Sequence, residues 1–133
     1  MKRFLQPSLP VAILRMLMGI ILMAHAIARL ADYTIPGFGD FLNSKGFPLG
    51  FYLAWAVTLF ELAGGFCMFL GYFIRLFCIG EIIILFTGII LVHWQNGWFV
   101  VGKTLGGIEY SVVLIIVLAV IFLADSQKKN SSP

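Results

Sequence analysis

The sequence predicts an all-α integral membrane protein, a four-helix bundle that forms a single membrane domain over residues 1–133. Three observations lead to this fold class. Hydrophobic residues make up 61% of the chain and charged residues only 11%, whereas a soluble domain carries about 45–50% and about 25%. Four separate stretches are long enough to cross a hydrocarbon core about 30 Å thick, which takes roughly 20 helical residues. Because so few charges cannot cover a water-facing surface, the composition argues against a soluble globular enzyme. The 13 Phe exclude a disordered chain.

The four predicted spans cover residues 11–30, 51–71, 75–94 and 105–124. In lipid each segment must satisfy its own backbone polar groups, so these segments are helices and not the alternating strands of a β-barrel. Residues 31–50 hold the turn-forming pairs Pro36-Gly37 and Asn43-Ser44 and predict a loop. Residues 71–74 predict a tight hairpin, Asn96-Gly97 predicts a turn, and residues 125–133 form a polar tail.

The distribution of basic residues predicts the orientation of the chain in the membrane. Four spans put both termini on one side, and that side holds five Lys and Arg residues against three on the other side. The five are Lys2, Arg3, Arg75, Lys128 and Lys129, and the three are Arg29, Lys45 and Lys103. The positive-inside rule therefore places both termini in the cytoplasm.

Ionisable side chains inside or at the ends of the predicted spans are the candidate site residues. They are Arg15, His25, Arg29, Glu61, Glu81, His93 and Glu109. A charge at the bilayer centre costs at least about 2.5–3.5 kcal/mol, so it normally faces the protein interior and finds a partner. From depth alone we expect Arg15 to pair with Glu81, with Glu61 within its reach. Arg29 is expected to pair with Glu109 in an outer layer that also holds the two histidines.

Two interpretations of these residues stay open. In the first, the ion pairs between spans only set the register of the helices. In the second, the charges line a functional polar pocket. His93 also has a simpler interpretation, as the end of a helix in an aromatic belt with Trp94 and Trp98. No His, Cys or carboxylate cluster has the spacing of a metal site, Cys67 and Cys78 are expected to be free, and the scattered basic residues predict no nucleic-acid partner.

Several short motifs, taken in order, resemble the DoxX family of small four-helix bacterial membrane proteins. They are Arg15 with Gly19, Glu61 followed by Gly64-Gly65, Gly71 with Arg75, the run His93-Trp94-Gln95-Asn96-Gly97-Trp98-Phe99, and Gly106-Gly107-Ile108-Glu109-Tyr110. The resemblance covers roughly residues 10–124. Ala26 and Arg29 stand where many members have Gly and Lys, and Glu81 matches no family feature. The resemblance implies a multi-pass protein of the bacterial inner membrane, from a family named after a subunit of a quinone-linked oxidase.

The function that this resemblance implies is that of a membrane subunit or anchor in a quinone-linked or thiol-linked redox system. A quinone is the cofactor to consider, although the sequence carries no cofactor signature. Arg15 or His25 would donate hydrogen bonds to a quinone carbonyl, and a carboxylate would relay a proton. The partners to consider beside the lipid bilayer are a soluble redox enzyme and a second copy of the chain. Two alternatives remain, a small proton-coupled transporter and a non-catalytic assembly scaffold, and the sequence leaves open whether the chain catalyses a reaction.

Overall fold

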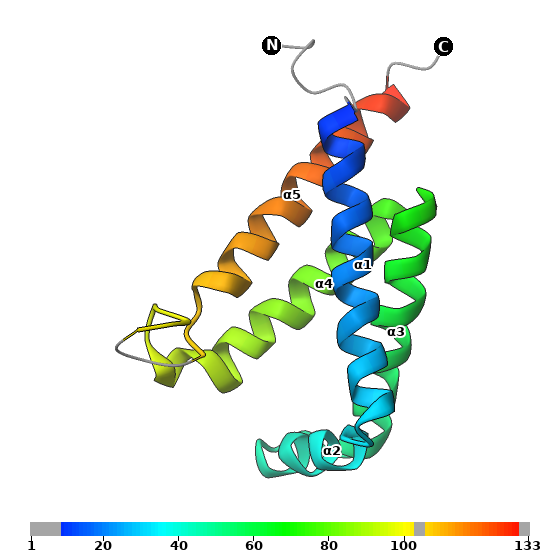
Figure 1. Ribbon diagram of the computed structural model, residues 1–133. Coiled ribbons are helices and arrows are strands. Elements are labelled where there is room, and N and C mark those ends of the chain that lie inside the picture. The colour runs from blue at the N-terminus through cyan, green and yellow to red at the C-terminus, as the bar shows by residue number, and fades with distance from the viewer. Residues whose placement is uncertain (1–8, 103–105, 131–133) are drawn as a thin grey trace. The chain divides into compact units, whose positions relative to one another are not determined.

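The structure is a computed structural model that describes residues 9–102 and 106–130 (Figure 1). Every regular element in these ranges is helical. The elements are α1 (Leu9–Ala31), α2 (Ile35–Ser44), α3 (Gly50–Leu70), α4 (Ile74–Gly88), the π-helical turn η2 (Ile89–His93), the 3-10 turn η3 (Trp94–Asn96) and α5 (Glu109–Asn130). Four stretches are long and apolar enough to cross a membrane, namely Leu9–Ala31, Gly50–Leu70, Ile74–Asn96 and Glu109–Ser126. The all-α class and the four spans are therefore confirmed, and the helices imply a lipid bilayer as surroundings.

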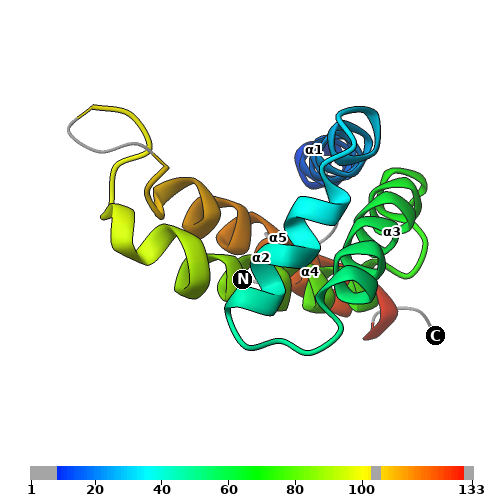
Figure 2. The ribbon, with the colours of Figure 1, turned by 90° about the horizontal axis from the view of Figure 1, so that it is seen from below.

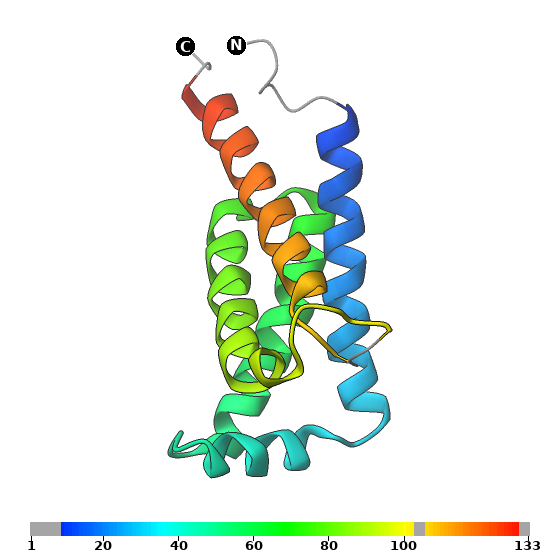
Figure 3. The ribbon, with the colours of Figure 1, turned by 90° about the vertical axis from the view of Figure 1, so that its left-hand side faces the viewer.

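The segment predicted as a loop between the first two spans contains the helix α2, so that prediction was wrong. Pro36 occupies the first turn of α2, where a proline loses no hydrogen bond and its fixed φ suits a helix start. Ile35 and Leu42 lie seven residues apart on one face of α2 and are buried with Ala54 of α3. Packing on α3 therefore outweighs the local turn signals. Figure 3 shows α2 lying across the ends of α1 and α3.

Both ends of the last helix also differ from the prediction. The fourth span was expected to begin at residue 105, but α5 begins at Glu109, because residues 106–108 are held in a closed loop that is described below. The same helix continues to Asn130, so residues 125–130 of the predicted polar tail are helical, and residues 131–133 lie outside the described part of the chain.

The described chain divides into two compact units, and the first consists of residues 16–72. In this unit α1 and α3 lie side by side and run antiparallel (Figures 1 and 2). Their backbones touch at Gly19 and Gly65. A Cβ atom on Gly19 would lie 2.5 Å from the carbonyl oxygen of Gly65, and a Cβ atom on Gly65 would lie 2.6 Å from that of Gly19. No side chain fits at either position, which is the way small residues bring membrane helices together.

The second unit contains residues 9–15 and the chain from Phe73 onward. Here α4 packs against α5. At the start of α4, Arg75 Nε lies 3.4 Å from Asp125 Oδ2, and the Arg75 guanidinium lies 5.9 Å from the centre of the Phe122 ring. These contacts join the first turn of α4 to the late part of α5.

Candidate functional site

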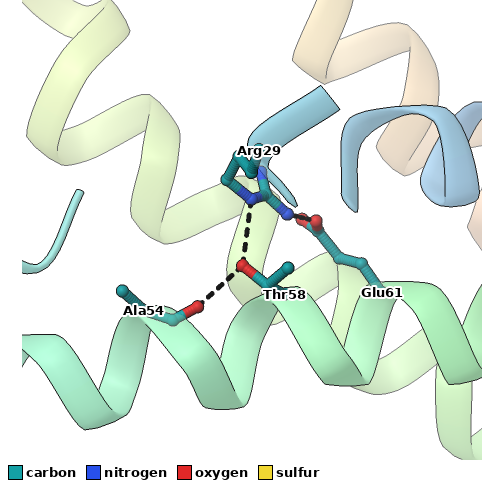
Figure 4. Close-up of polar contacts among 4 residues, drawn as sticks. All are labelled: Arg29, Ala54, Thr58 and Glu61. Carbon is teal, nitrogen blue, oxygen red and sulfur yellow. Dashed lines mark hydrogen bonds and ion pairs between the residues drawn. The ribbon is translucent and has the colours of Figure 1, made fainter. Parts of the chain in front are cut away.

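The first polar cluster, called here the Arg29 cluster, consists of Arg29, Thr58 and Glu61 and lies in the first unit (Figure 4). Arg29 Nε donates a hydrogen bond of 3.1 Å to Thr58 Oγ1, and Arg29 Nη2 forms an ion pair with Glu61 Oε2. The Thr58 hydroxyl donates in turn to the Ala54 carbonyl at 2.8 Å. Thr58 is fully buried and Glu61 is 7% exposed. The cluster is therefore a charged pair held inside an apolar helix pair.

The register of α1 against α3 explains why these three residues meet. Gly19 faces Gly65, and in an antiparallel pair the residue ten positions later on α1, Arg29, faces the turn of α3 that begins ten positions earlier. Side chains on a helix lean toward its N-terminus, so the long Arg29 side chain leans back toward the middle of the span. That direction brings its guanidinium to Thr58 and then to Glu61.

Arg29 also contacts the helix that the sequence did not predict. Its guanidinium carbon lies 5.7 Å from the centre of the Phe38 ring of α2, in a cation–π arrangement. One side chain at the end of α1 thus contacts both α2 and α3. Because this link depends on where α2 folds back, it could not be read from the spans alone.

Depth along the spans predicted other partners for Arg29 and Glu61, while the expected pair of Arg15 with Glu81 stays a prediction. Glu61 was expected within reach of Arg15 and Arg29 was expected to pair with Glu109, whereas the structure pairs Arg29 with Glu61. Depth along a span does not give the rotation and register of the helices, and these decide which partner a charge reaches. Arg15 is half-buried on α1, and its Nε finds no hydrogen-bond partner among the described residues. Glu81, its expected partner, is 1% exposed in α4.

The second polar cluster, called here the His93 loop, consists of His93, Asn96 and the chain from residue 97 to Glu109, of which residues 103–105 lie outside the description. Backbone hydrogen bonds fold this chain back on itself. They run from Gly106 N to Val100 O (3.2 Å), from Gly107 N to Phe99 O (3.1 Å), from Ile108 N to Gly97 O (3.1 Å) and from Glu109 N to Trp98 O (3.0 Å). The Glu109 side chain adds a bond, because its Oε1 accepts from the Val100 N–H at 2.9 Å.

The loop holds the imidazole of His93 in one orientation. Its Nδ1 lies 2.6 Å from the Gly106 carbonyl oxygen, and Asn96 Nδ2 donates to the same oxygen at 3.3 Å. A carbonyl only accepts, so Nδ1 carries the hydrogen, and in the neutral ring Nε2 is then the acceptor. His93 is the last residue of the π-helical turn η2, and such turns insert an extra residue into a helix and occur often at functional sites.

Three large aromatic side chains in or next to the His93 loop are exposed. Trp94 is 69% exposed, Trp98 52% and Phe99 53% within the chain itself. Tryptophan and other aromatic residues at the end of a membrane span are typical of the boundary between headgroups and acyl chains. The half-buried His93 ring therefore lies near the end of the span Ile74–Asn96, beside aromatic residues of the kind that favour this boundary.

The remaining predicted residues take no part in either cluster. His25 is exposed on α1. Cys67 is half-buried and Cys78 is buried, and both are free. In residues 9–102 and 106–126 no group of three or more His, Cys, Asp or Glu residues is arranged to hold a metal ion. Sequence reasoning missed Thr58 and Asn96, although each lies three residues from a predicted site residue, a spacing that puts both on one helix face.

These features define a multi-pass membrane protein that carries two polar clusters at or within its spans. The DoxX family model matches residues 11–94 of the chain, which is more than half of it. The protein belongs to the DoxX family. The match includes Arg15, Glu61 and His93 and ends before Gly106 to Tyr110, the last motif of the resemblance. Comparison with curated proteins and with solved structures yields no match.

Proposed function

We propose that this DoxX-family protein is a membrane subunit of a redox system in the bacterial inner membrane and that His93 binds the head group of a quinone or quinol. The observation that carries this proposal is the 2.6 Å hydrogen bond between His93 Nδ1 and the Gly106 carbonyl. A ring oriented through one nitrogen offers its other nitrogen for proton exchange, which is the arrangement of a general base with a positioning partner.

The two forms of the ring suit the two forms of the ligand. Neutral His93 accepts a hydrogen bond at Nε2 from a hydroxyl, and protonated His93 donates from Nε2 to a carbonyl. Interconversion of quinone and quinol moves two electrons and two protons. His93 would carry one of these protons at Nε2, interfacial water would take the other, and a soluble redox enzyme would exchange the electrons. Trp94 and Trp98 would hold the apolar part of the head group on the lipid side.

The experiment compares two histidine variants. Purified protein in phosphatidylcholine vesicles is titrated with a short-chain quinone, and binding is followed by the quenching of tryptophan fluorescence. His93→Gln should weaken binding about tenfold, the loss of about one hydrogen bond. His25→Gln is the comparison variant and tests the other histidine that the sequence offers as a quinone donor; if His93 is the donor, His25→Gln should bind like the unchanged protein. Equal affinity for both variants, or no quinone binding by the unchanged protein, would contradict the proposal.

The Arg29 cluster favours a second candidate, a proton-coupled carrier. Glu61 is an almost fully buried carboxylate in the middle of a span, and such residues mark proton relays in transporters. In proteoliposomes with a pH gradient, a carrier would accumulate a solute and Glu61→Gln would abolish the uptake, whereas a redox subunit would move nothing. If neither assay responds and both variants alter only stability, the remaining alternative is an assembly scaffold.

A further inference from the structure

Three helices of the chain end in the same backbone motif, the Schellman motif. In it the residue just past the helix adopts the left-handed conformation, and two N–H groups bond back to the last carbonyls. The bonds run from Tyr33 N to Leu30 O (3.4 Å) and Thr34 N to Arg29 O (3.1 Å) after α1, from Gly46 N to Asn43 O (3.0 Å) and Phe47 N to Leu42 O (3.1 Å) after α2, and from Gly71 N to Met68 O (3.2 Å) and Tyr72 N to Cys67 O (2.8 Å) after α3.

The residue in the left-handed position differs among the three. α2 and α3 use Gly46 with φ 88° and Gly71 with φ 90°, whereas α1 uses Tyr33 with φ 54°. Glycine adopts this conformation freely because it has no Cβ. A bulky residue there is an outlier that costs conformational free energy. Since the same chain uses glycine twice in this motif, a gain elsewhere must offset the strain at Tyr33.

The same strain occurs at the starts of two spans. Leu49 (φ 62°) precedes α3 and Phe73 (φ 51°) precedes α4, and neither makes a side-chain capping hydrogen bond. The residues that favour this cap position are Ser, Thr, Asp and Asn, whose side chains bond to the free N–H groups. Each of these positions therefore carries a strained backbone, and its own side chain does not cap the helix; at the start of α3 the Gly50 N–H donates instead to Asn43 Oδ1 at 2.9 Å.

Packing inside the chain does not supply the free energy that would offset this backbone strain. Tyr33 is 87% exposed, Leu49 68% and Phe73 73%. Tyr33 lies two residues after the span Leu9–Ala31, Leu49 directly before Gly50–Leu70, and Phe73 directly before Ile74–Asn96. In the described chain Tyr33, Leu49 and Phe73 are also the complete set of non-glycine residues with positive φ. Strain, exposure and the end of a membrane span thus coincide at all three positions.

We propose that Tyr33, Leu49 and Phe73 are strained interfacial anchors, whose side chains insert into the bilayer at the boundary between headgroups and acyl chains. Apolar and amphipathic side chains gain free energy at this depth, and that gain offsets the left-handed backbone. The three anchors set the depth of the ends of α1, α3 and α4. These three anchors are independent of the quinone proposal, because they belong to neither the His93 loop nor the Arg29 cluster.

The depth of the three side chains can be measured with spin labels. In a background with Cys67→Ala and Cys78→Ala, single cysteines replace Tyr33, Leu49 or Phe73 in vesicles of phosphatidylcholine and phosphatidylglycerol. Ser44→Cys is the aqueous control and Leu59→Cys, exposed in the middle of α3, is the deep control. The ratio of oxygen to nickel accessibility should place all three labels between the two controls. Labels as accessible to nickel as the one at residue 44, or as deep as the one at residue 59, would overturn the proposal.

A second measurement uses no cysteine substitutions. Tyr33→Gly relaxes the backbone and removes the side chain, whereas Tyr33→Phe keeps an aromatic side chain and the strain. If Tyr33 is an anchor, Tyr33→Gly should not raise the midpoint of thermal unfolding in the same vesicles and Tyr33→Phe should leave it unchanged. If the strain has no compensation from lipid, relief of the strain should raise the midpoint by about 2–4 °C. Such a rise for Tyr33→Gly would overturn the proposal.

Discussion

At the scale of single residues, one glycine pair decides which charges can meet. Gly19 and Gly65 bring the backbones of α1 and α3 together, and that contact sets the register in which Arg29 reaches Thr58 and Glu61. Two residues that look like ordinary small packing residues in the sequence therefore determine the geometry of the Arg29 cluster.

The close approach predicts a large cost for a single methyl group. Gly65→Ala should lower the free energy of unfolding by about 1–3 kcal/mol, because the new Cβ would overlap the Gly19 backbone. Unfolding in mixed micelles with increasing sodium dodecyl sulfate measures the loss. Gly88→Ala is the matched control, since a Cβ there meets no described atom within 4 Å, and it should leave stability unchanged or raise it by up to about 1 kcal/mol.

The ion pair itself predicts an asymmetric set of variants. Arg29→Gln leaves the buried Glu61 carboxylate without its cation and should cost about 1–3 kcal/mol of unfolding free energy. Replacing both residues together, Arg29→Leu with Glu61→Leu, should recover most of that loss, since an apolar pair needs no desolvated charge. A double-mutant cycle of Arg29→Leu, Glu61→Leu and the double variant measures the coupling. Additive losses in the two single variants and the double variant would mean that the pair contributes nothing.

At the scale of elements, the His93 loop is a unit in which a side chain fastens a backbone. Glu109, the first residue of α5, bonds to the Val100 N–H, and Gly106 receives bonds from His93 and Asn96. Gly107 admits no side chain, because a Cβ would lie 2.5 Å from the Trp98 carbonyl oxygen. The orientation of the His93 ring therefore depends on Gly106, which follows it by 13 residues in the sequence.

The Glu109 contact predicts a local loosening of the loop. Glu109→Ala removes the acceptor of the Val100 N–H, and a hydrogen bond to a charged group contributes about 1.5–3 kcal/mol. Amide hydrogen exchange at Val100 should speed up at least about tenfold, since every 1.4 kcal/mol corresponds to a factor of ten. Exchange at Thr58, in the other unit, is the internal control and should not change. An unaltered rate at Val100 would mean that the backbone bonds alone hold the loop.

At the scale of the whole molecule, four apolar helices make this a multi-pass membrane protein of the DoxX family. An even number of spans puts the two termini on one side, and the excess of basic residues on that side predicts the cytoplasm.

Labelling in whole cells tests this orientation. In the background without native cysteines, a membrane-impermeant maleimide should label Ser44→Cys in intact cells, because residue 44 follows the first span. Ser132→Cys, near the C-terminus and outside the described residues, should be labelled only after the cells are lysed. The reverse pattern would invert the predicted orientation.

The sequence by itself determined the membrane class and the number of spans, and it contained both residues of the Arg29–Glu61 pair. These are local properties: hydrophobic length decides whether a segment enters lipid, and each candidate charge can be found without knowing its neighbours. The helix α2 was missed because Pro36-Gly37 signals a turn locally, while burial of Ile35 and Leu42 against α3 stabilises a helix.

Only the tertiary structure decided which of these side chains meet. The pairing of Arg29 with Glu61 follows from the contact of Gly19 with Gly65, and the orientation of His93 follows from a loop that closes on Gly106. Both depend on helix register and loop closure, which are set by packing between segments far apart in sequence. Depth along a single span carries no information about rotation, and rotation determines which partner a charge can reach.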